Sequence, residues 1–458
     1  MNFKHVALIG IELMIFVLSA CGGIPANQTS SPGQDLVGTM VAETMTAMAF
    51  DPAAQSTDVP TLLPADTAEP TFLPPPAVLH VAYVKDNNAW IWMEGGSTLQ
   101  LTTFADVNDV RISSDGGQVA YLRDTGSLSH ELWVVNADGS NNHVVASQAD
   151  LLATYSGLPA DMPSGIGVFQ FDWRPGSHQL FYNTRPLFEG PGLGGFDDLH
   201  MVDTDSLVKT TFFLTGDGGR FVFSPDGSRL GLITPTSISL VNADGTHLYR
   251  NVLVFPSVIT YSEYFYYPNP VWAQDSNGLK VVIPPGDPLA DPLLPSNVYS
   301  IAVDGSPAVL SGSIMAMPFA WPDEAISPDL TRLGFAQPSG APGSGVRDIN
   351  LANADGSGVV MYLNAEGAEF LGWLPNSLQF VFRAASGPDI GTHVSSTAEG
   401  YFTITSDPAQ VRSISWVDAT HYLCLWQNGG STELKYNVLS GPQTVVDSGE
   451  IWSYSFTR

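Results

Sequence analysis

A short motif that recurs through this 458-residue chain constrains its fold more than any other feature. Ser-Pro-Asp-Gly, or a close variant, leads into an apolar stretch, and Asn-Ala-Asp-Gly follows some residues later. The three clearest copies pair 112–121 with 132–140, 223–233 with 239–246, and 326–335 with 349–357. Asp-Gly suits tight turns because glycine accepts a positive φ and aspartate bonds to its own nearby backbone. The motif therefore predicts strands joined by short turns.

Weaker copies of the same start extend the pattern along the chain. They begin at residues 171, 271, 371 and 414. The spacing is about 40–60 residues, which is typical of a propeller blade rather than of a helical solenoid repeat. Each unit is expected to comprise strand, tight turn, strand, loop, strand, Asp-Gly turn and strand. The sequence thus predicts an all-β propeller of four-stranded antiparallel blades.

The two ends of the repeat region are expected to form one further blade together. Segments 79–84, 89–93 and 99–103 match the second, third and fourth strands of a blade that lacks its first. The last apolar stretch, 451–456, matches an isolated first strand. Joining the two ends closes the ring and covers strand edges that would otherwise promote aggregation. Seven internal repeats and this composite blade predict eight blades, with seven as the alternative if one weak copy is incomplete.

The turn sequences also carry a resemblance. Ser-Pro-Asp-Gly at 224–227 and Asn-Ala-Asp-Gly at 242–245 resemble the repeat of TolB-type propellers and of the propeller domains of prolyl oligopeptidases. The resemblance covers residues 78–458 and implies a TolB-like, WD40-like β-propeller. Because the motif reports turns and packing, it implies nothing specific about function.

The first 21 residues resemble the signal of a bacterial lipoprotein. A short positive start precedes an apolar stretch over 6–17, which is shorter than the roughly 20 residues that a membrane-spanning helix needs. The four residues 18–21, Leu-Ser-Ala-Cys, then resemble a lipobox. The resemblance implies that residues 1–20 are a signal peptide and that Cys21 carries the lipid. Two acyl chains give a lasting membrane anchor where one does not.

The next segment, 21–77, is rich in Pro, Thr and Ala, which predicts a disordered tether. The formal net charge is -28, from 45 acidic and 17 basic residues, and this charge disfavours nucleic acid as a partner. We therefore expect a monomeric propeller over 78–458 that is held at the cell membrane through its lipid. It would face the periplasm or the cell exterior, and the sequence leaves the membrane leaflet open.

Motifs for catalysis or metal binding are not found in the sequence. The chain contains no G-x-S-x-G pentapeptide, which a hydrolase nucleophile elbow requires. Asp197-Asp198 and Asp203-x-Asp205 are the densest oxygen pairs, but no loop has the spacing of a calcium site, so we interpret them as solvated turn acids. Cys424 lies in an apolar run, which predicts an inert buried thiol. We predict no enzymatic activity, no metal and no cofactor.

Long insertions are expected on one face of the propeller. In a four-stranded antiparallel blade, the second-to-third loops and the connections between blades lie on the same face. The long loops predicted there are 186–197, 284–296, 337–346, 384–400, 151–168 and 255–269. Loops of this length on a rigid scaffold usually carry function. We call this side the long-loop face, and the opposite side the tight-turn face.

One of these loops is rich in aromatic residues, which offer a large contact area at low entropic cost. The candidate ligand contacts are Tyr261, Tyr264, Phe265, Tyr266 and Tyr267. The alternative is that these rings only cover the propeller rim or fill its channel.

The predicted function is a lipid-anchored extracytoplasmic binding or scaffold module for an envelope protein, peptide or glycan. The alternative is a propeller enzyme, of the glycoside hydrolase, lactonase or lyase type, with its site at the central channel. Arg, Asp and Tyr side chains converging on the channel would favour the enzyme, and an apolar aromatic face would favour the binding module. A third interpretation is a surface protein without a specific small ligand.

Overall fold

The computed structural model describes residues 78–458, which belong to the compact unit Thr71–Arg458. The segments left out of this range are 127, 156–163, 189–193, 261–263, 288–289, 291, 317–325, 342 and 398–399. The predicted signal peptide (1–20), the lipidated Cys21 and the tether (21–77) lie outside the described residues, so they stay predictions.

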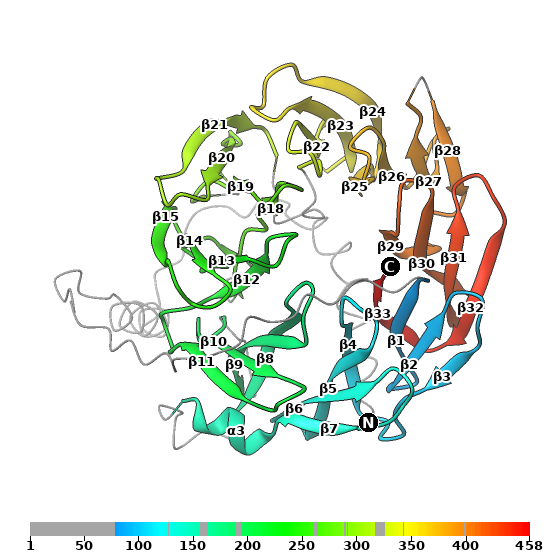
Figure 1. Ribbon diagram of the computed structural model, residues 1–458. Helices are drawn as coiled ribbons and strands as arrows, with labels where there is room; N and C mark the ends of the chain where they lie inside the picture. Colours follow the sequence, from blue (N-terminus) through cyan, green and yellow to red (C-terminus); the bar gives the residue numbers. More distant parts are fainter. Residues whose placement is uncertain are drawn as a thin grey trace, which may run out of the picture. The chain divides into compact units, whose positions relative to one another are not determined.

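Eight antiparallel sheets follow one another around a ring, and each is one blade of a β-propeller (Figure 1). The strands of blades 1 to 4 are β1 (His80–Lys85), β2 (Asn88–Met93), β3 (Thr98–Gln100) and β33 (Ile451–Thr457); β4 (Val107–Ile112), β5 (Gln118–Gly126), β6 (Ser129–Asn136) and β7 (His143–Ala146); β8 (Ser164–Trp173), β9 (Gln179–Phe188), β10 (Leu199–Asp203) and β11 (Lys209–Phe213); and β12 (Arg220–Phe223), β13 (Arg229–Ile233), β14 (Ser237–Asn242) and β15 (Tyr249–Val254).

The strands of blades 5 to 8 are β18 (Val271–Trp272), β19 (Gly278–Ile283), β20 (Ser296–Ala302) and β21 (Val309–Ile314); β22 (Arg332–Pro338), β23 (Val346–Asn353) and β24 (Val360–Glu366); β25 (Glu369–Trp373), β26 (Phe380–Ala384), β27 (Gly391–Ser395) and β28 (Tyr401–Thr405); and β29 (Val411–Trp416), β30 (His421–Asn428), β31 (Ser431–Val438) and β32 (Gln443–Gly449). The all-β fold and the eight blades are confirmed. In blade 6, the place of the first strand is taken by Ile326, which forms an isolated bridge with Leu333.

Blade 1 closes the ring as the sequence predicts. Its strand order is β3-β2-β1-β33, so the C-terminal strand pairs with the first strand after the tether region. The register runs antiparallel from His80 opposite Thr457 to Lys85 opposite Ile451. Closure covers the free edge of β1, which would otherwise be open to pairing with another chain.

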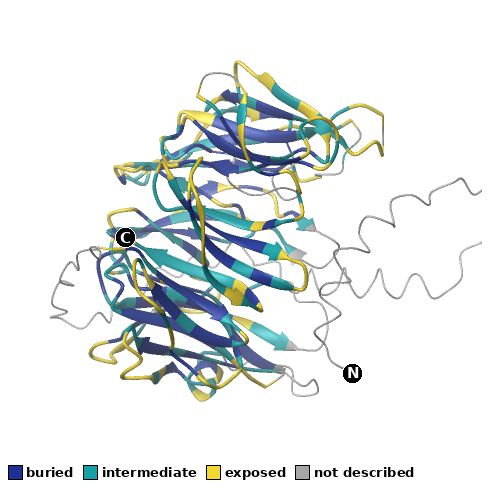
Figure 2. Cartoon of the chain, turned by 90° about the vertical axis from the view of Figure 1, so that its right-hand side faces the viewer, coloured by how far each residue is buried: buried dark blue, intermediate teal, exposed yellow. Residues whose placement is uncertain are grey.

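The core lies between neighbouring blades, where buried residues occupy the strand interiors and exposed residues the turns (Figure 2). In one cluster, Leu79 and Tyr83 of blade 1 pack with Leu423 and Leu434 of blade 8 and with Ile451. Tyr83 is fully buried. Truncation of such an aromatic side chain to alanine costs about 3–5 kcal/mol.

A hydrogen bond and a required glycine in the tight turns explain why the sequence motif recurs from blade to blade. Ser224 Oγ donates to Asp226 Oδ1 at 2.6 Å, and the same bond forms at the equivalent turns of blades 2 and 6. At the Asp-Gly turn of blade 4, Gly245 has φ +83° and a Cβ there would lie 2.7 Å from Phe212 of the preceding blade. Glycine is required at this position because the conformation is left-handed and the neighbouring blade is close.

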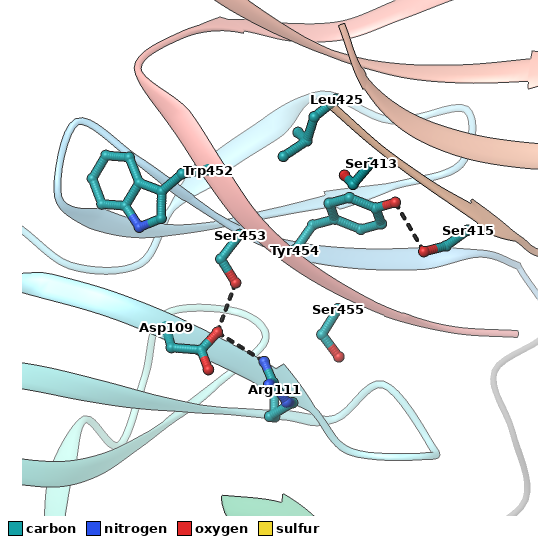
Figure 3. Close-up of a pocket in the computed structure, with 9 residues that line it drawn as sticks. All are labelled: Asp109, Arg111, Ser413, Ser415, Leu425, Trp452, Ser453, Tyr454 and Ser455. Carbon is teal, nitrogen blue, oxygen red and sulfur yellow. Dashed lines mark hydrogen bonds and ion pairs between the residues drawn. The ribbon is translucent and has the colours of Figure 1, made fainter. Parts of the chain in front are cut away.

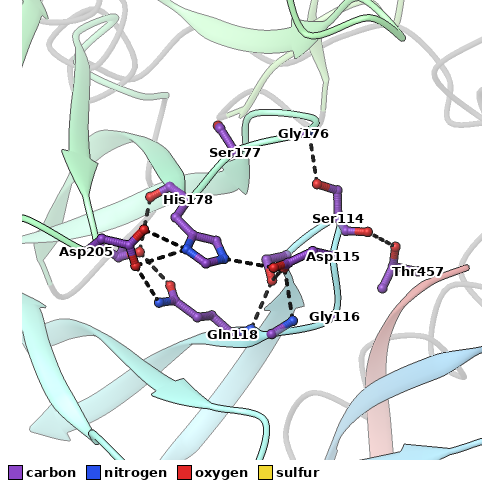
Figure 4. A network of polar contacts seen from close by, with 12 residues as sticks. Ser114, Asp115, Gly116, Gln118, Gly176, Ser177, His178, Asp205 and Thr457 are labelled. Atoms are coloured by element: carbon purple, nitrogen blue, oxygen red, sulfur yellow. Dashed lines mark hydrogen bonds and ion pairs between the residues drawn. The ribbon is translucent and has the colours of Figure 1, made fainter. Parts of the chain in front are cut away.

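A network of polar contacts joins three blades on the tight-turn face (Figure 4). His178 of blade 3 lies between two carboxylates, with Nε2 3.2 Å from Asp115 Oδ2 of blade 2 and Nδ1 2.9 Å from Asp205 Oδ2 of its own blade. Thr457 of β33 donates to the Ser114 carbonyl at 2.6 Å, and the Gly176 amide donates to Ser114 Oγ at 2.8 Å. These hydrogen bonds therefore connect the C-terminal strand β33 to blades 2 and 3.

Three of the predicted long loops contain a helix, a hairpin or a further strand besides the ends of the strands that they connect, so those loop predictions are wrong in part. Segment 384–400 contains the third strand of blade 7, β27, whose pairing with β26 the sequence analysis missed. Segment 255–269 contains a short hairpin of β16 (Ile259–Thr260) and β17 (Tyr264–Phe265). Segment 151–168 includes the end of the helix α3 (Gln148–Ala153), which begins at a Ser147 capping box, and the start of β8.

Candidate binding site around the propeller axis

A cavity of about 330 Å³ lies at the propeller axis, between the first strands of blades 1, 2 and 8 (Figure 3). We call it the axial cavity. β4 contributes Asp109 and Arg111 and β29 contributes Ser413 and Ser415, in pairs spaced two apart, since alternate side chains of a strand point to the same side. β33 contributes four consecutive residues, Trp452 to Ser455, and Leu425 of β30 completes the lining. The volume falls within the roughly 300–1,000 Å³ of small-ligand sites.

The charged groups of the axial cavity are paired with each other. Arg111 Nη1 donates to Asp109 Oδ1 at 2.8 Å and to the Val110 carbonyl at 2.7 Å. Ser453 Oγ donates to the same Asp109 oxygen at 2.6 Å. The side chains of Arg111 and Asp109 remain 35% and 31% exposed. A bound molecule could therefore contact an oriented acid–base pair without displacing it.

The uncharged groups of the cavity differ in whether their polar atoms have hydrogen-bond partners. Tyr454 OH donates to Ser415 Oγ at 2.9 Å, and Ser455 Oγ accepts the Ile112 amide at 3.2 Å. Ser413 Oγ is buried and has no hydrogen-bond partner among the described residues. Trp452 donates through Nε1 to the Asn108 carbonyl at 3.0 Å. The tryptophan nevertheless remains 40% exposed, which leaves part of its ring open to the cavity.

A second carboxylate lies beside the Asp109–Arg111 pair on the first strand of blade 3. Asp172 accepts the Trp173 amide at 2.8 Å, and Trp173 Nε1 donates to the Arg111 carbonyl at 3.0 Å. The enclosing protein raises the pKa of Asp172 above its ordinary value, and Arg111 opposes this shift only in part. Its side chain is still reached by water.

A larger cavity of about 510 Å³ lies farther around the axis, and we call it the arginine pocket. Its walls are mostly apolar, and Pro268 and Pro270 contribute to them. Arg220 supplies the positive charge; its guanidinium carbon lies 5.6 Å from the centre of the Phe169 ring and 5.5 Å from that of Tyr267. Stacking on two rings fixes the guanidinium at the pocket wall.

The aromatic residues predicted as ligand contacts lie next to this pocket. Tyr267 is buried, accepts the Gly195 amide at 3.2 Å and donates to Asp197 at 3.4 Å. Phe265 is half-buried and packs against the core cluster of blades 4 and 5. Tyr266 is half-buried, and Tyr261 and the Tyr264 side chain lie outside the described residues. Tyr267 therefore supports Arg220 and the 194–198 loop, and ligand contact by the five residues stays a prediction.

The interpretation of Asp197 and Asp198 as solvated turn acids is wrong. Asp198 is 2% exposed and accepts the Thr184 amide at 2.8 Å and the Thr184 hydroxyl, while His200 Nε2 lies 3.0 Å away. Burial, with a smaller contribution from Asp198, raises the pKa of Asp197 to about 7 despite the hydrogen bond from Tyr267. The loop between β9 and β10 folds inward, which buries Asp198 and leaves Asp197 half-buried. By contrast, Asp203 and Asp205 occupy a turn on the surface, as predicted.

Cys424 is a free thiol with no exposed surface, which confirms the predicted buried cysteine. Burial raises its pKa to about 12. Within the described ranges, the His, Cys, Asp and Glu side chains form no group of three or more that could hold a metal ion. The helical segments that the structure describes fall short of the length and apolarity of a membrane span.

Sequence reasoning missed the residues of the axial cavity. Asp109, Arg111, Ser453 and Trp452 belong to none of the motifs that the sequence analysis considered. A usable signal was present, because 451–456 was already predicted to be a first strand and first strands surround the axis. Polar residues two apart on that strand, Ser453 and Ser455, indicate a side that is not packed against apolar neighbours.

No family model and no curated protein matches this sequence. Solved structures are similar in fold at low identity. TolB from Acinetobacter baumannii is 12% identical over 60% of this chain, with a TM-score of 0.32, and this chain spans only 61% of that protein. An oligogalacturonate lyase in complex with manganese is 13% identical over 77% of this chain and 82% of its own, with a TM-score of 0.42.

The β-propeller domain of the Trilobed protease from Pyrococcus furiosus is a third similar structure. It is 10% identical over 75% of this chain and 95% of its own, with a TM-score of 0.43. Similar propellers therefore occur in a lyase, in a protease and in TolB. At these identities the likeness concerns the fold alone.

Proposed function

We propose that this chain is a binding module of the cell envelope, anchored through a lipid on Cys21, that holds a glycan or a segment of a peptide or protein at the propeller axis. The axial cavity carries this proposal. It combines an oriented Asp109–Arg111 pair with Trp452, which lines the cavity and is 40% exposed. A few placed polar groups beside an aromatic surface are typical of ligand sites.

The pairing of Asp109 favours binding over catalysis. A general base or nucleophile must have an available lone pair in reach of the substrate. Asp109 Oδ1 accepts from the Val110 amide, from Arg111 and from Ser453. The described lining contains no histidine, cysteine or lysine. These groups are arranged to recognise a molecule rather than to transform one.

A propeller enzyme is the second candidate, and Asp172 is the observation in its favour. Arg, Asp and Tyr side chains do converge at the axis, and the two carboxylates Asp109 and Asp172 have different environments. Glycoside hydrolases use such a pair, in which the acid with the raised pKa donates a proton. Under this alternative Asp172 would donate the proton and Asp109 would be the second carboxylate of the pair.

The test is capture of envelope proteins and of a glycan array by the full-length chain in detergent. The variant Asp109→Asn/Arg111→Gln removes both charges at nearly constant volume, and we expect it to lower capture at least about tenfold, or about 1.4 kcal/mol. The matched control is Asp217→Asn/Arg250→Gln, which makes the same exchange at an exposed ion pair on β15. Equal capture by the two variants would exclude the axial cavity. Turnover of a glycoside or lactone panel that Asp172→Asn abolishes would replace the binding role with the enzyme.

A further inference from the structure

The arginine pocket differs from the axial cavity in the residues that form its walls. Its described lining is mostly apolar and comes from four blades; it includes the half-buried Val222 of β12, Val271 of β18 and Leu371 of β25. These three strands face the centre of the ring (Figure 1). The volume of about 510 Å³ lies within the range of small-ligand sites. The two described linings share no residue, so this pocket is a separate site.

Arg220 is the only ionisable residue of the described lining. Its guanidinium carbon lies over the rings of Phe169 and Tyr267, at 5.6 and 5.5 Å from their centres. Such ring contacts involve the face of a guanidinium, whereas its N–H donors lie in its plane. The arginine can therefore keep both ring contacts while it bonds to a carboxylate through two parallel N–H···O bonds.

The charge of this lining contrasts with that of the whole chain. The protein has 45 acidic and 17 basic residues, yet the described lining contains Arg220 and no carboxylate. Asp197 accepts a 3.4 Å hydrogen bond from Tyr267 and is not part of the described lining. Burial raises its pKa to about 7, so it carries less negative charge at neutral pH than an ordinary aspartate. Apolar walls strengthen the attraction of a guanidinium for an anion, and the pocket thus favours one negative charge.

Two amide side chains complete the polar part of the described lining. Gln170 is engaged by the fold, since it donates to the Phe221 carbonyl at 2.7 Å and accepts the Phe221 amide at 3.1 Å. Asn269 lies between two buried prolines and is exposed, and an amide can donate or accept. The other described side chains of the lining are apolar. This suits a ligand whose polar part is confined to one end.

We propose that the arginine pocket binds a carboxylate with an apolar body, whose carboxyl group pairs with Arg220 and whose apolar part contacts Val222, Val271 and Leu371. A carboxylic acid with a hydrocarbon chain and the C-terminus of a peptide that ends in an apolar residue share this chemistry. Because the pocket is separate from the axial cavity, this proposal goes beyond the function proposed above and does not depend on it.

The experiment measures binding to the full-length chain in detergent by calorimetry, with detergent alone as the blank. The probes are acetate, butanoate and hexanoate, their amides, and the peptide acetyl-Gly-Gly-Leu with a free or an amidated C-terminus. We expect each carboxylate to bind at least about tenfold more tightly than its amide, because only the carboxylate is charged. From acetate to hexanoate, Kd should fall about threefold for each added methylene. The comparison of hexanoate with the free peptide distinguishes the two sources of the carboxylate.

Three variants test the pocket itself. Arg220→Gln removes the charge and should raise the Kd of hexanoate at least about tenfold. Arg220→Lys keeps the charge but lacks the planar fork of donors, so its Kd should lie between those of the unchanged protein and Arg220→Gln. Leu371→Ala shortens one apolar wall and should weaken the binding of hexanoate more than that of acetate.

Two matched variants control for effects on folding. Arg250→Gln removes the arginine of the exposed ion pair with Asp217. Leu378→Ala removes a leucine that is 53% exposed in the tight turn of blade 7. Both should leave the Kd of hexanoate unchanged, and circular dichroism should show that all variants are folded. Equal loss of binding in the control and pocket variants would overturn the proposal.

The remaining outcomes also decide the proposal. Amides that bind as tightly as the carboxylates would overturn the role of Arg220, and this comparison holds even if Arg220→Gln does not fold. A Kd that is independent of chain length would exclude the apolar body. If no probe binds, the proposal is wrong, whereas the function proposed for the axial cavity stands or falls by capture that depends on Asp109 and Arg111.

Discussion

Aspartates on the tight-turn face differ from those of the propeller interior in the donors that surround them. Although partial burial raises it, hydrogen bonds from Ser224 and Ser228 lower the pKa of Asp226 below its usual value. Asp329 in blade 6 is held in the same way by its own turn. Around the axis and behind the long-loop face, burial instead raises the pKa of Asp172 and Asp197.

The difference shows how one residue type serves two purposes. In a turn, an aspartate receives its donors from residues one to four positions away, and it stabilises the blade while ionised. An interior aspartate depends on donors from other strands, and where these are few the charge is costly. The half-buried Asp197 therefore reduces stability at neutral pH.

Asp198 is the most deeply buried acid among the described residues, at 2% exposed, and its loss should have the largest effect. Replacement by alanine leaves the Thr184 amide and hydroxyl without their acceptor in a buried site. Asp198→Ala should destabilise the protein by about 3–5 kcal/mol in urea unfolding. The control is Asp203→Ala, which removes a surface turn acid that accepts from Ser206 and should cost about 1 kcal/mol. Equal losses of stability in the two variants would contradict the proposed difference between interior and turn aspartates.

Replacement of Asp197 should stabilise the protein, in contrast to replacement of Asp198. The pKa of Asp197 is about 7 in the folded protein against 3.8 in the unfolded chain, so ionisation opposes folding increasingly as the pH rises from 4 to 7. Asp197→Asn removes this penalty and keeps a residue that tolerates the observed φ of 51°. We expect a gain of about 2 kcal/mol at pH 8, less than the full shift implies because the group is partly solvated, and almost none at pH 4. Chemical denaturation at both pH values tests this, and a gain independent of pH would contradict it.

The contact of His178 with two carboxylates on the tight-turn face should contribute less to stability. This contribution should be present only over a defined range of pH. Burial lowers the pKa of His178, but Asp115 and Asp205 outweigh it and raise the pKa above the usual 6.5. This stabilisation is present below about pH 6.5 and is lost as the pH rises through the folded pKa. Hydrogen bonds, chiefly with His178 and Ser113, hold the pKa of Asp115 well below 3.8 against the effect of burial, so its contribution is lost in acid. The contact should therefore be strongest between about pH 4 and 6.5.

His178→Asn should cost about 1 kcal/mol at pH 5.5 and less at pH 8. The matched control is His247→Asn, because His247 lies exposed in the Asp-Gly turn of blade 4 and touches only Asn242 and Thr246. Thermal unfolding at the two pH values compares them. A loss that is the same at both pH values, or the same in both variants, would show that His178 acts by packing alone.

The sequence predicted the blades more completely than the site. The strands of blade 1 were placed to within a few residues, because their apolar alternation and turn residues are local properties. The strand β27 was missed, because Gly391–Ser395 is short and contains polar residues that are buried only by neighbouring strands. The two cavities were missed for a related reason, since no local pattern distinguishes Asp109 from a surface acid.

The sequence by itself determined the turns, the four-strand unit and the closure of the ring, and it favoured eight blades over seven. Each of these depends on chemistry between residues close along the chain, or on the match between two chain ends. Only the tertiary structure decided which polar groups meet: Ser453 donates to Asp109 across a separation of 344 residues. The physical reason is that a repeat specifies backbone bonds within a blade, whereas the axial cavity is built from side chains that become neighbours only when the ring closes.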